Sequence, residues 1–245
     1  MMRITTYKSY QVGSGLDLTQ AQIQQLISLL NRRQTVSDTP LGDPGKPLGG
    51  RGKPLGGRGA LSRASIDGIG SIAVKHYKRG GLVRHVVRSK YLKWGDTRGL
   101  KEYEILQTVR NLGINAPEPL IWVYRGKLVY SAWLVTRHIM ASKSLTQLSL
   151  ENEDLAVRAM QSAVDQMMTL VQNKILHVDL HPGNVLVDPE GKVYLLDFDK
   201  GRIFRGSRQQ LQERYFARWK RAVIKHGLPA MLIDRMRNGI EDVKS

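Results

Sequence analysis

The segment 175–201, ILHVDLHPGNVLVDPEGKVYLLDFDKG, alternates short apolar runs with loops that carry acidic and amide side chains. The apolar runs have the length and β-branched content of short buried strands. They are Ile175–Val178, Val185–Val187 and Val193–Leu196. Asp179 and Asn184 lie five residues apart between the first two runs, and Asp197 directly follows the third. This pattern predicts polar side chains held at the ends of buried strands, and that requirement restricts the possible folds more than any other part of the chain.

The three polar residues match the needs of phosphoryl transfer. That reaction requires a carboxylate to receive the proton of the acceptor hydroxyl and oxygen ligands to hold Mg²⁺ against nucleotide phosphates. Asp179 is the candidate catalytic base, and Asn184 and Asp197 are the candidate metal ligands. A lone aspartate on a turn is usually a capping residue, but the spacing HxDxxxxN followed by DFx resembles the protein-kinase-like catalytic and metal loops. ATP and Mg²⁺ are therefore the expected cofactors.

The N-terminal half supplies candidates for the nucleotide side of such a site. A strand is predicted over Ser71–Tyr77, and its IAVK sequence resembles the kinase strand whose lysine, here Lys75, neutralises phosphate charge. The next helix offers Glu102 as the ion-pair partner of that lysine, with Glu104 as the competitor.

Glycines before this strand are candidates for a phosphate-binding loop. Gly57 and Gly59, with neighbouring Gly56, would let backbone amides approach phosphate oxygens. Their spacing is not GxGxxG. The heptapeptide GKPLGGR also occurs twice in succession from Gly45 to Arg58, so Gly49 and Gly50 form a second candidate pair.

Hydrophobic periodicity predicts an α+β chain with two lobes around a nucleotide. Helices are expected over Leu16–Arg33, Thr97–Asn111 and Asp154–Gln172, with a last long helix capped by Ser207, and a hairpin over Leu120–Tyr124 and Leu128–Ile139. We expect a protein-kinase-like two-lobed fold. Residues 1–140 would form an N-terminal segment and a nucleotide-binding lobe, with an antiparallel sheet, one helix and the glycine-rich loop. Residues 141–245 would form a mainly helical lobe with the catalytic and metal loops and a basic C-terminal helix.

Several runs outside the common kinase motifs point to one group of kinases. They are GRG before the strand, KHYKRGGLVR, RGLKEYEIL leading into APEP, DLHPGNVLVD and LLDFDKGRI. Together, over residues 56–208, the chain resembles the bacterial lipopolysaccharide-core kinases, a family that includes the 3-deoxy-D-manno-octulosonic acid (Kdo) kinases. The resemblance implies an ATP-dependent kinase that phosphorylates a Kdo hydroxyl on the lipid A-linked inner core, on the cytoplasmic face of the inner membrane. It also implies the catalytic role of Asp179.

The positive charge of the chain is concentrated in two segments. Residues 75–101 and 200–225 hold eighteen of the 38 basic residues and only two of the 21 acidic ones, which accounts for nearly all of the net charge of +17. Such clustering indicates a face that meets an anionic partner. A phosphorylated and carboxylated glycolipid at an anionic membrane surface fits this expectation. No nucleic-acid-binding signature accompanies the charge, so no nucleic-acid partner is expected. The chain has no cysteine, which excludes disulfides and thiolate chemistry.

Departures from the protein-kinase pattern bear on the acceptor. Val178 stands where protein kinases have an arginine, and Asp199 replaces the glycine of DFG. No APE motif follows, which favours a small or lipid-linked acceptor over a protein. A small atypical Ser/Thr protein kinase or another small-molecule phosphotransferase, such as an aminoglycoside type, remains the alternative on the same fold. A non-catalytic membrane-surface binding module is the third possibility. No secretory signal and no apolar stretch of membrane-spanning length are visible, so we expect an intracellular, peripheral protein.

Overall fold

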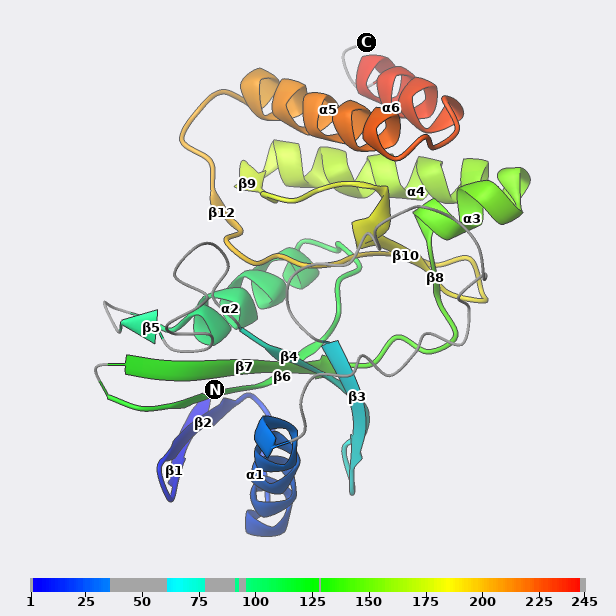
Figure 1. The fold of residues 1–245 in the computed structure, drawn as a ribbon. Coiled ribbons are helices and arrows are strands. Elements are labelled where there is room, and N and C mark those ends of the chain that lie inside the picture. The colour runs from blue at the N-terminus through cyan, green and yellow to red at the C-terminus, as the bar shows by residue number, and fades with distance from the viewer. Residues whose placement is uncertain (1, 36–60, 78–90, 93–95, 128, 243–245) are drawn as a thin grey trace. The chain divides into compact units, whose positions relative to one another are not determined.

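The computed structural model describes residues 2–35, 61–77, 91–92, 96–127 and 129–242 (Figure 1). The chain divides into two compact units. The first contains residues 1–104 and 118–138, and the second contains residues 105–117 and 139–245. The sequence-based division into 1–140 and 141–245 differs from this mainly in the segment 105–117, which packs with the second unit.

The first unit is built on an antiparallel sheet. Its strand order is β1-β2-β6-β7-β4-β3, and β5 pairs with β7 off this path. The strands are β1 (Arg3–Tyr7), β2 (Tyr10–Ser14), β3 (Leu61–Ile66), β4 (Gly70–His76), β5 (Tyr91–Leu92), β6 (Pro119–Arg125) and β7 (Val129–Arg137). The expected strand at 71–77 and the expected hairpin of β6 and β7 are confirmed. The first two strands and β3 were not anticipated.

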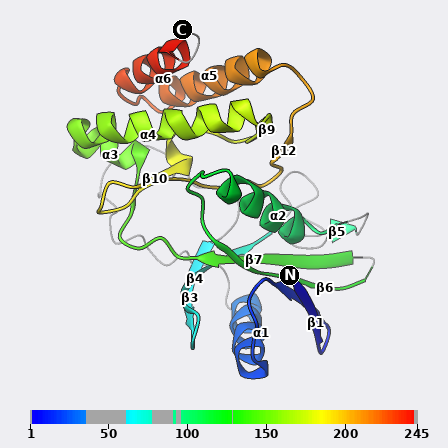
Figure 2. The ribbon, with the colours of Figure 1, turned by 180° about the vertical axis from the view of Figure 1, so that it is seen from behind.

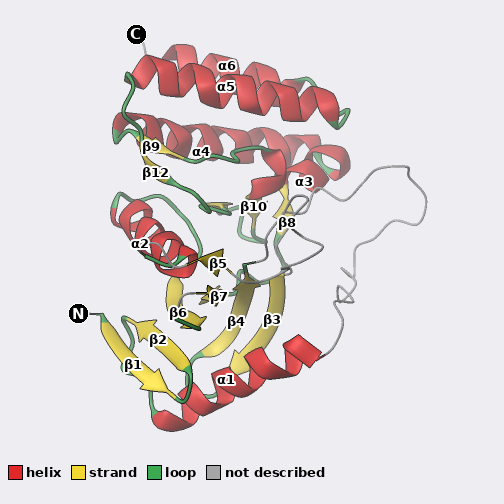
Figure 3. Ribbon diagram, turned by 60° about the vertical axis from the view of Figure 1, so that its left-hand side comes forward, coloured by secondary structure: helices red, strands yellow, loops and turns green. Residues whose placement is uncertain are grey.

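Helix α1 (Gln20–Thr35) covers one face of this sheet (Figure 3). Thr19 and Gln22 form a capping box, with hydrogen bonds in both directions between side chain and backbone. The apolar stripe of the helix is buried against strand residues such as Val74 and Val135. The stripe consists of Ile23, Leu26, Ile27 and Leu30. Because strand side chains alternate between faces, Lys75 and Tyr77 point away from this core.

The second unit is organised around helix α4 (Glu153–Gln172), which packs against helices α3, α5 and α6 and strands β9 and β11. In Figure 2 it lies between the helix pair α5 and α6 on one side and the short strands on the other. Ten of its side chains are buried, including Ala156, Met160, Val164 and Met167. Apolar residues on most of its circumference explain this central position.

The other helices of the second unit flank α4. They are α3 (Leu145–Glu151), α5 (Arg208–Lys225) and α6 (Met231–Asp242). Ser207 caps α5 in a capping box with Gln210, as expected. Helix α2 (Arg98–Asn111) also forms as expected; its residues up to 104 belong to the first unit and the remainder to the second.

Short strands position the candidate catalytic segment. Strand β10 (Val185–Val187) pairs with β11 (Val193–Leu195) and β8 (Lys143–Ser144), and β9 (Ile175–Leu176) pairs with β12 (Arg202–Ile203). Between β9 and β10 the chain forms a single 3₁₀ turn, η2 (Pro182–Asn184). Within the residues that the structure describes, we find no helix with the length and apolar character needed to span a bilayer.

Candidate active site

In the first unit, Lys75 on β4 is paired with Glu102 on α2. The Lys75 ammonium donates to both carboxylate oxygens of Glu102, at 2.9 and 2.8 Å. The Tyr77 hydroxyl donates to Oε2 of the same carboxylate at 2.6 Å. Glu102 is buried, with 4 % of its side chain exposed, whereas Glu104 is exposed. The structure therefore brings Lys75 to Glu102, the preferred of the two sequence candidates.

The pairing follows from the periodicities of the two elements. Lys75 lies near the end of β4, and Tyr77 directly follows its last residue, His76. Side chains two positions apart along a strand direction point to one side, and both of these reach Glu102 in the first turns of α2. Burying a carboxylate requires compensating donors. The lysine and the tyrosine provide them together, and the Lys75 ammonium also lies over the Tyr77 ring at 5.3 Å from its centre. Tyr77 is thus a member of this cluster that motif matching did not identify.

In the second unit, Asn184 is locked onto the segment that carries Asp179. Its side-chain Nδ2 donates to the backbone carbonyl of Asp179 at 2.8 Å, and its backbone carbonyl accepts from Leu196 N at 2.8 Å. His181 caps the intervening 3₁₀ turn, with Nδ1 accepting from Gly183 N at 3.1 Å. Asp179, Asn184 and the residue before Asp197 are therefore held in one hydrogen-bonded unit. The spacing identified in the sequence becomes a spatial cluster.

Asp197 begins the loop after β11 with a left-handed backbone, φ 60°. This conformation is uncommon for a non-glycine residue, although aspartate tolerates it better than most. The next residue, Phe198, is fully buried and its carbonyl accepts from Gly201 N at 2.7 Å, which closes the turn. Asp197 is thereby held at the start of a tight loop.

His177 organises the segment from within. Its Nε2 lies 2.7 Å from the carbonyl of Leu196, and its ring meets Phe198 edge-on at 4.5 Å between centres. The residue is buried. These contacts indicate that His177 orients the catalytic loop rather than acting as a base.

The side chain of Asp179 is 42 % exposed and lies next to Arg218 and His181. Arg218 of α5 donates from Nη2 to Oδ1 of Asp179, and Nε2 of His181 lies 3.9 Å from the same oxygen. Burial lowers the pKa of His181, and His226 nearby lowers it further, so His181 is mainly neutral at pH 7. Burial also lowers the pKa of Arg218, with a further decrease from Arg221. Arg218 is a contact that sequence motifs could not show.

The donor chemistry at these loops fits a hard divalent cation. Because Asn184 uses its amide nitrogen on the Asp179 carbonyl, its Oδ1 is the atom left to coordinate a cation. A carboxylate from Asp197 and an amide oxygen are the ligand types that Mg²⁺ prefers. Gly57 and Gly59, proposed for the phosphate loop, and the alternatives Gly49 and Gly50 lie outside the described residues, as does the repeated heptapeptide.

Comparison with known sequences places this arrangement in a family. The sequence model of the lipopolysaccharide kinase (Kdo/WaaP) family matches residues 53–238. The chain belongs to this family. The α+β, protein-kinase-like fold expected from the sequence is confirmed by the family and by the antiparallel sheet and helices described above. The match spans the ion pair of the first unit and all of the catalytic-loop residues.

Curated relatives carry the printed name 3-deoxy-D-manno-octulosonic acid kinase. The protein from Vibrio parahaemolyticus is 31 % identical over 159 residues, 62 % of this chain and 66 % of the relative. One from Vibrio vulnificus is 30 % identical over 131 residues, 52 % of this chain and 55 % of the relative. The Photobacterium profundum protein is 34 % identical over 134 residues, 53 % and 56 % of the two chains. Each of these matches spans less than two thirds of the relative's length.

Proposed function

We propose that the protein is an ATP-dependent kinase that phosphorylates a hydroxyl of a Kdo sugar on the lipid A-linked inner core during lipopolysaccharide biosynthesis. The observation that carries the proposal is the hydrogen-bonded cluster of Asp179, Asn184 and the Asp197 loop in a chain of the Kdo/WaaP family. The relatives' printed name supports Kdo as the acceptor sugar.

Each residue of the candidate site has its own role in the proposed reaction. In the proposed reaction Lys75 neutralises nucleotide phosphate charge, and Glu102 and Tyr77 hold its ammonium in place. Asn184 and Asp197 hold the Mg²⁺, and Asp179 receives the acceptor proton. When bound, Mg²⁺–ATP supplies the phosphoryl group and neutralises the charge that develops during transfer. Gly57 and Gly59 are proposed to approach the phosphates.

The acceptor is proposed to be anionic. Arg218 of α5 donates to the Asp179 carboxylate that would receive the acceptor proton. A cation beside the base favours a carboxylated and phosphorylated sugar acceptor over an aminoglycoside, whose own charge is positive.

The test is transfer of a radiolabelled γ-phosphate in the presence of Mg²⁺. The acceptors would be Kdo-bearing lipid A precursor, the same precursor without Kdo, a generic protein and a panel of aminoglycosides. We expect label on the Kdo-bearing lipid alone. Label on the Kdo-free lipid would move the acceptor to another sugar. Label on the protein or the aminoglycosides would favour the corresponding alternative kinase.

Two variants make this assay specific for the proposed site. Asp179→Asn preserves the shape of the base and removes its ability to accept a proton, so it should abolish transfer. Asp165→Asn changes an exposed carboxylate on α4 and should leave transfer unchanged. Loss of transfer with both variants would contradict the assignment of Asp179, and absence of label with the wild-type protein would favour a binding module.

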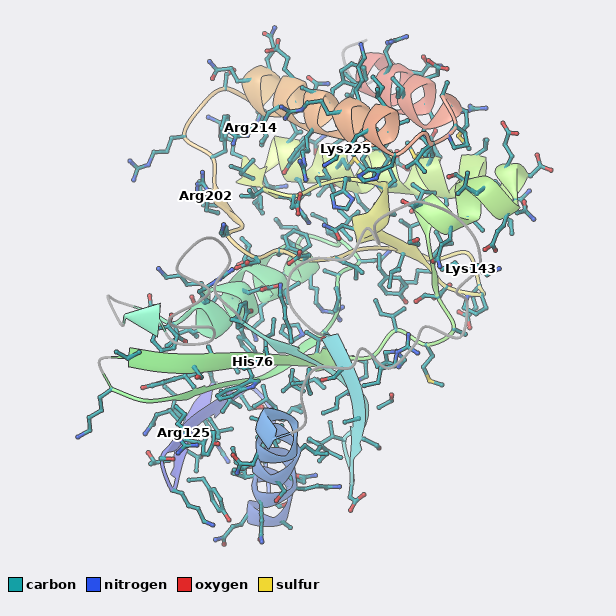
Figure 4. The ribbon with its side chains drawn as sticks, in the orientation of Figure 1. His76, Arg125, Lys143, Arg202, Arg214 and Lys225 are labelled. Atoms are coloured by element: carbon teal, nitrogen blue, oxygen red, sulfur yellow. The ribbon has the colours of Figure 1, made fainter. Side chains whose placement is uncertain are left out.

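We also propose that the protein works at the cytoplasmic face of the inner membrane, held there by its basic surface. Exposed cations on β12 and α5 support this, and two strongly exposed isoleucines, Ile203 and Ile224, lie among them. Figure 4 labels Arg202, Arg214 and Lys225 of this set. Cations attract anionic headgroups, and exposed apolar side chains can enter the interface. The basic residues at 78–93 that the sequence assigns to the same surface lie outside the described residues.

Vesicle sedimentation tests this location. Arg202, Arg214 and Lys225 changed together to Gln should weaken binding to anionic phospholipid vesicles, by about 1 kcal/mol per charge, and reduce its salt dependence. A matched triple variant, Lys8, Lys127 and Lys192 to Gln, removes the same charge from other exposed positions. Equal weakening by both variants would show that total charge, and not this surface, drives binding.

A further inference from the structure

Helix α5 holds the catalytic segment at two points three residues apart. The Tyr215 hydroxyl donates to the carbonyl of Ile175 and accepts from His177 N at 2.8 Å. Arg218, on the same face of the helix, donates to Asp179. Alternate residues of the segment, 175, 177 and 179, are therefore each tied to α5.

Buried side chains hold helix α5 in the second unit, so the helix can fix the position of the residues that it contacts. Trp219 is fully buried and its indole N–H donates to the carbonyl of Leu232 at 2.8 Å. Leu211 and Tyr215 are also buried in the core of the second unit. The backbone at Arg218, from which its side chain extends, is therefore held in place. Its Nε is buried and makes no hydrogen bond to any part of the chain that the structure describes. Arg218 thus commits its terminal nitrogen to Asp179 while its Nε has no such partner.

Arg218 and His181 approach the same oxygen of the Asp179 carboxylate. The Arg218 Nη2 bond and the closest approach of His181 are both to Oδ1. No hydrogen bond from the described residues reaches Oδ2. Because a carboxylate is planar, fixing Oδ1 also fixes where Oδ2 lies. With Oδ1 occupied, Oδ2 is the oxygen that remains available to accept a hydrogen bond.

We propose that Arg218 is a positioning residue for the base Asp179. It holds Oδ1 so that Oδ2 is presented to the acceptor hydroxyl in one orientation. An arginine suits this role because its charge is permanent and its planar guanidinium directs its donors. The inference rests on the proposed function for the identity of the transferred group, whereas the contact itself exists without substrate. Arg218 thereby has a role different from that of its neighbours on the basic helix.

Arg221 provides the matched comparison. It lies three residues along the same helix, carries the same charge and is exposed, and its Nε donates to the carbonyl of Ala217 within the helix. If Arg218 acted only through positive charge, removal of either arginine would weaken acceptor binding to a similar extent. A positioning role instead predicts a loss of kcat with Arg218 alone.

The test uses Arg218→Met, Arg218→Lys and Arg221→Met in the kinase assay. Methionine keeps an unbranched apolar stem in place of the arginine stem, so the helix should remain packed. We expect Arg218→Met to lower kcat about 10²-fold, with the KM for ATP changed less than twofold, because misplacing a reacting group has costs of this order. Arg218→Lys should recover part of kcat, and Arg221→Met should retain it. Equal losses for the two methionine variants, or an effect confined to the acceptor KM, would overturn the proposal.

A second measurement is independent of the acceptor. Hydrogen exchange of the peptide covering 176–184, measured on the full chain without substrate, should be faster in Arg218→Met than in the wild-type protein or in Arg221→Met. If the wild-type protein transfers nothing to Kdo-bearing lipid, the proposed function fails, and this comparison still tests the positioning role. Identical exchange in all three proteins would overturn the positioning role even if the kinase assignment is correct.

Discussion

The Tyr77 hydroxyl donates a hydrogen bond of 2.6 Å to Oε2 of Glu102, the same carboxylate that holds Lys75. The residue two positions beyond the lysine, directly after β4, therefore supplies a further donor to the lysine's partner inside the first unit. Glu102 has only 4 % of its side chain exposed, so each of its donors matters more than it would at the surface.

Tyr77→Phe should destabilise the protein and impair nucleotide binding. The change leaves the ring packed but removes one donor from a buried carboxylate, which we expect to lower the free energy of unfolding by about 1–2 kcal/mol. The loosened Glu102 should also raise the KM for ATP. Urea unfolding and ATP titration measure the two effects. Tyr7→Phe is the control, because no hydrogen bond of the Tyr7 hydroxyl occurs among the described residues; equal destabilisation by both variants would contradict this prediction.

Glu102→Gln and Glu104→Gln should behave differently, although the sequence offers both glutamates to Lys75. Glu102→Gln replaces a charged acceptor of the Lys75 ammonium by a neutral amide, so the ammonium loses its ion pair. We expect a fall in kcat/KM for ATP of about tenfold or more, since 1.4 kcal/mol corresponds to a factor of ten. Glu104 is exposed, and its variant should retain wild-type kinetics. A larger loss with Glu104→Gln would reverse the assignment.

The parts of the site that the sequence predicted are those fixed by local spacing. Asp179 and Asn184 are five residues apart and are joined across one short 3₁₀ turn. With so few residues between them, their spacing in the sequence is enough to predict that they lie close together. The lysine of β4 was found in the same way, because alternation along a strand fixes which side chains share a face. Hydrophobic periodicity likewise predicted α1, α4 and α5.

The contacts that the sequence did not predict join residues far apart in the chain. Arg218 lies 39 residues from Asp179, and in the sequence it is one of nine cations in a basic segment. Nothing local distinguishes it from Arg221. The hairpin of β1 and β2 was missed for a related reason. Its first strand, RITTY, is exposed over four of its five residues, so it lacks the alternation that marks a half-buried strand.

Asn184→Ala should raise the Mg²⁺ concentration needed for half-maximal activity. The variant removes the proposed amide ligand and also the donor to the Asp179 carbonyl. We expect a shift of about tenfold or more, which corresponds to about 1.4 kcal/mol or more of lost binding. Asn184→Asp should bind Mg²⁺ better than the alanine variant but lose kcat, because a carboxylate cannot donate to that carbonyl. Asn238→Ala, an exposed change on α6, is the control; an unchanged Mg²⁺ requirement in Asn184→Ala would remove this residue from the metal site.

Stability should decrease at mildly acidic pH through His138. Burial lowers the pKa of His138 below its usual value of 6.5, and the positive charge of Arg63 lowers it further. Because the unfolded chain then binds a proton more readily than the folded one, the stabilisation is complete above pH 6.5 and is lost as the pH falls toward the folded pKa. Urea unfolding between pH 8 and pH 5 should show a smaller decrease in His138→Gln than in the wild-type protein. Parallel curves for the two proteins would contradict this origin.

Tyr215→Phe should lower kcat and stability together, at every accessible pH. The hydroxyl bridges the backbone of Ile175 and His177 in the core of the second unit, so its removal leaves a buried N–H and a buried carbonyl without this partner. Such groups cost about 1–3 kcal/mol each. Burial raises the pKa of Tyr215, so the hydroxyl stays protonated and the effect should not vary with pH. Tyr194→Phe, which loses a bond to Asp188 at a half-exposed position, should change stability less and leave kcat unchanged. A stability loss in Tyr215→Phe without any loss of kcat would mean that α5 supports the fold but does not set the position of the catalytic segment.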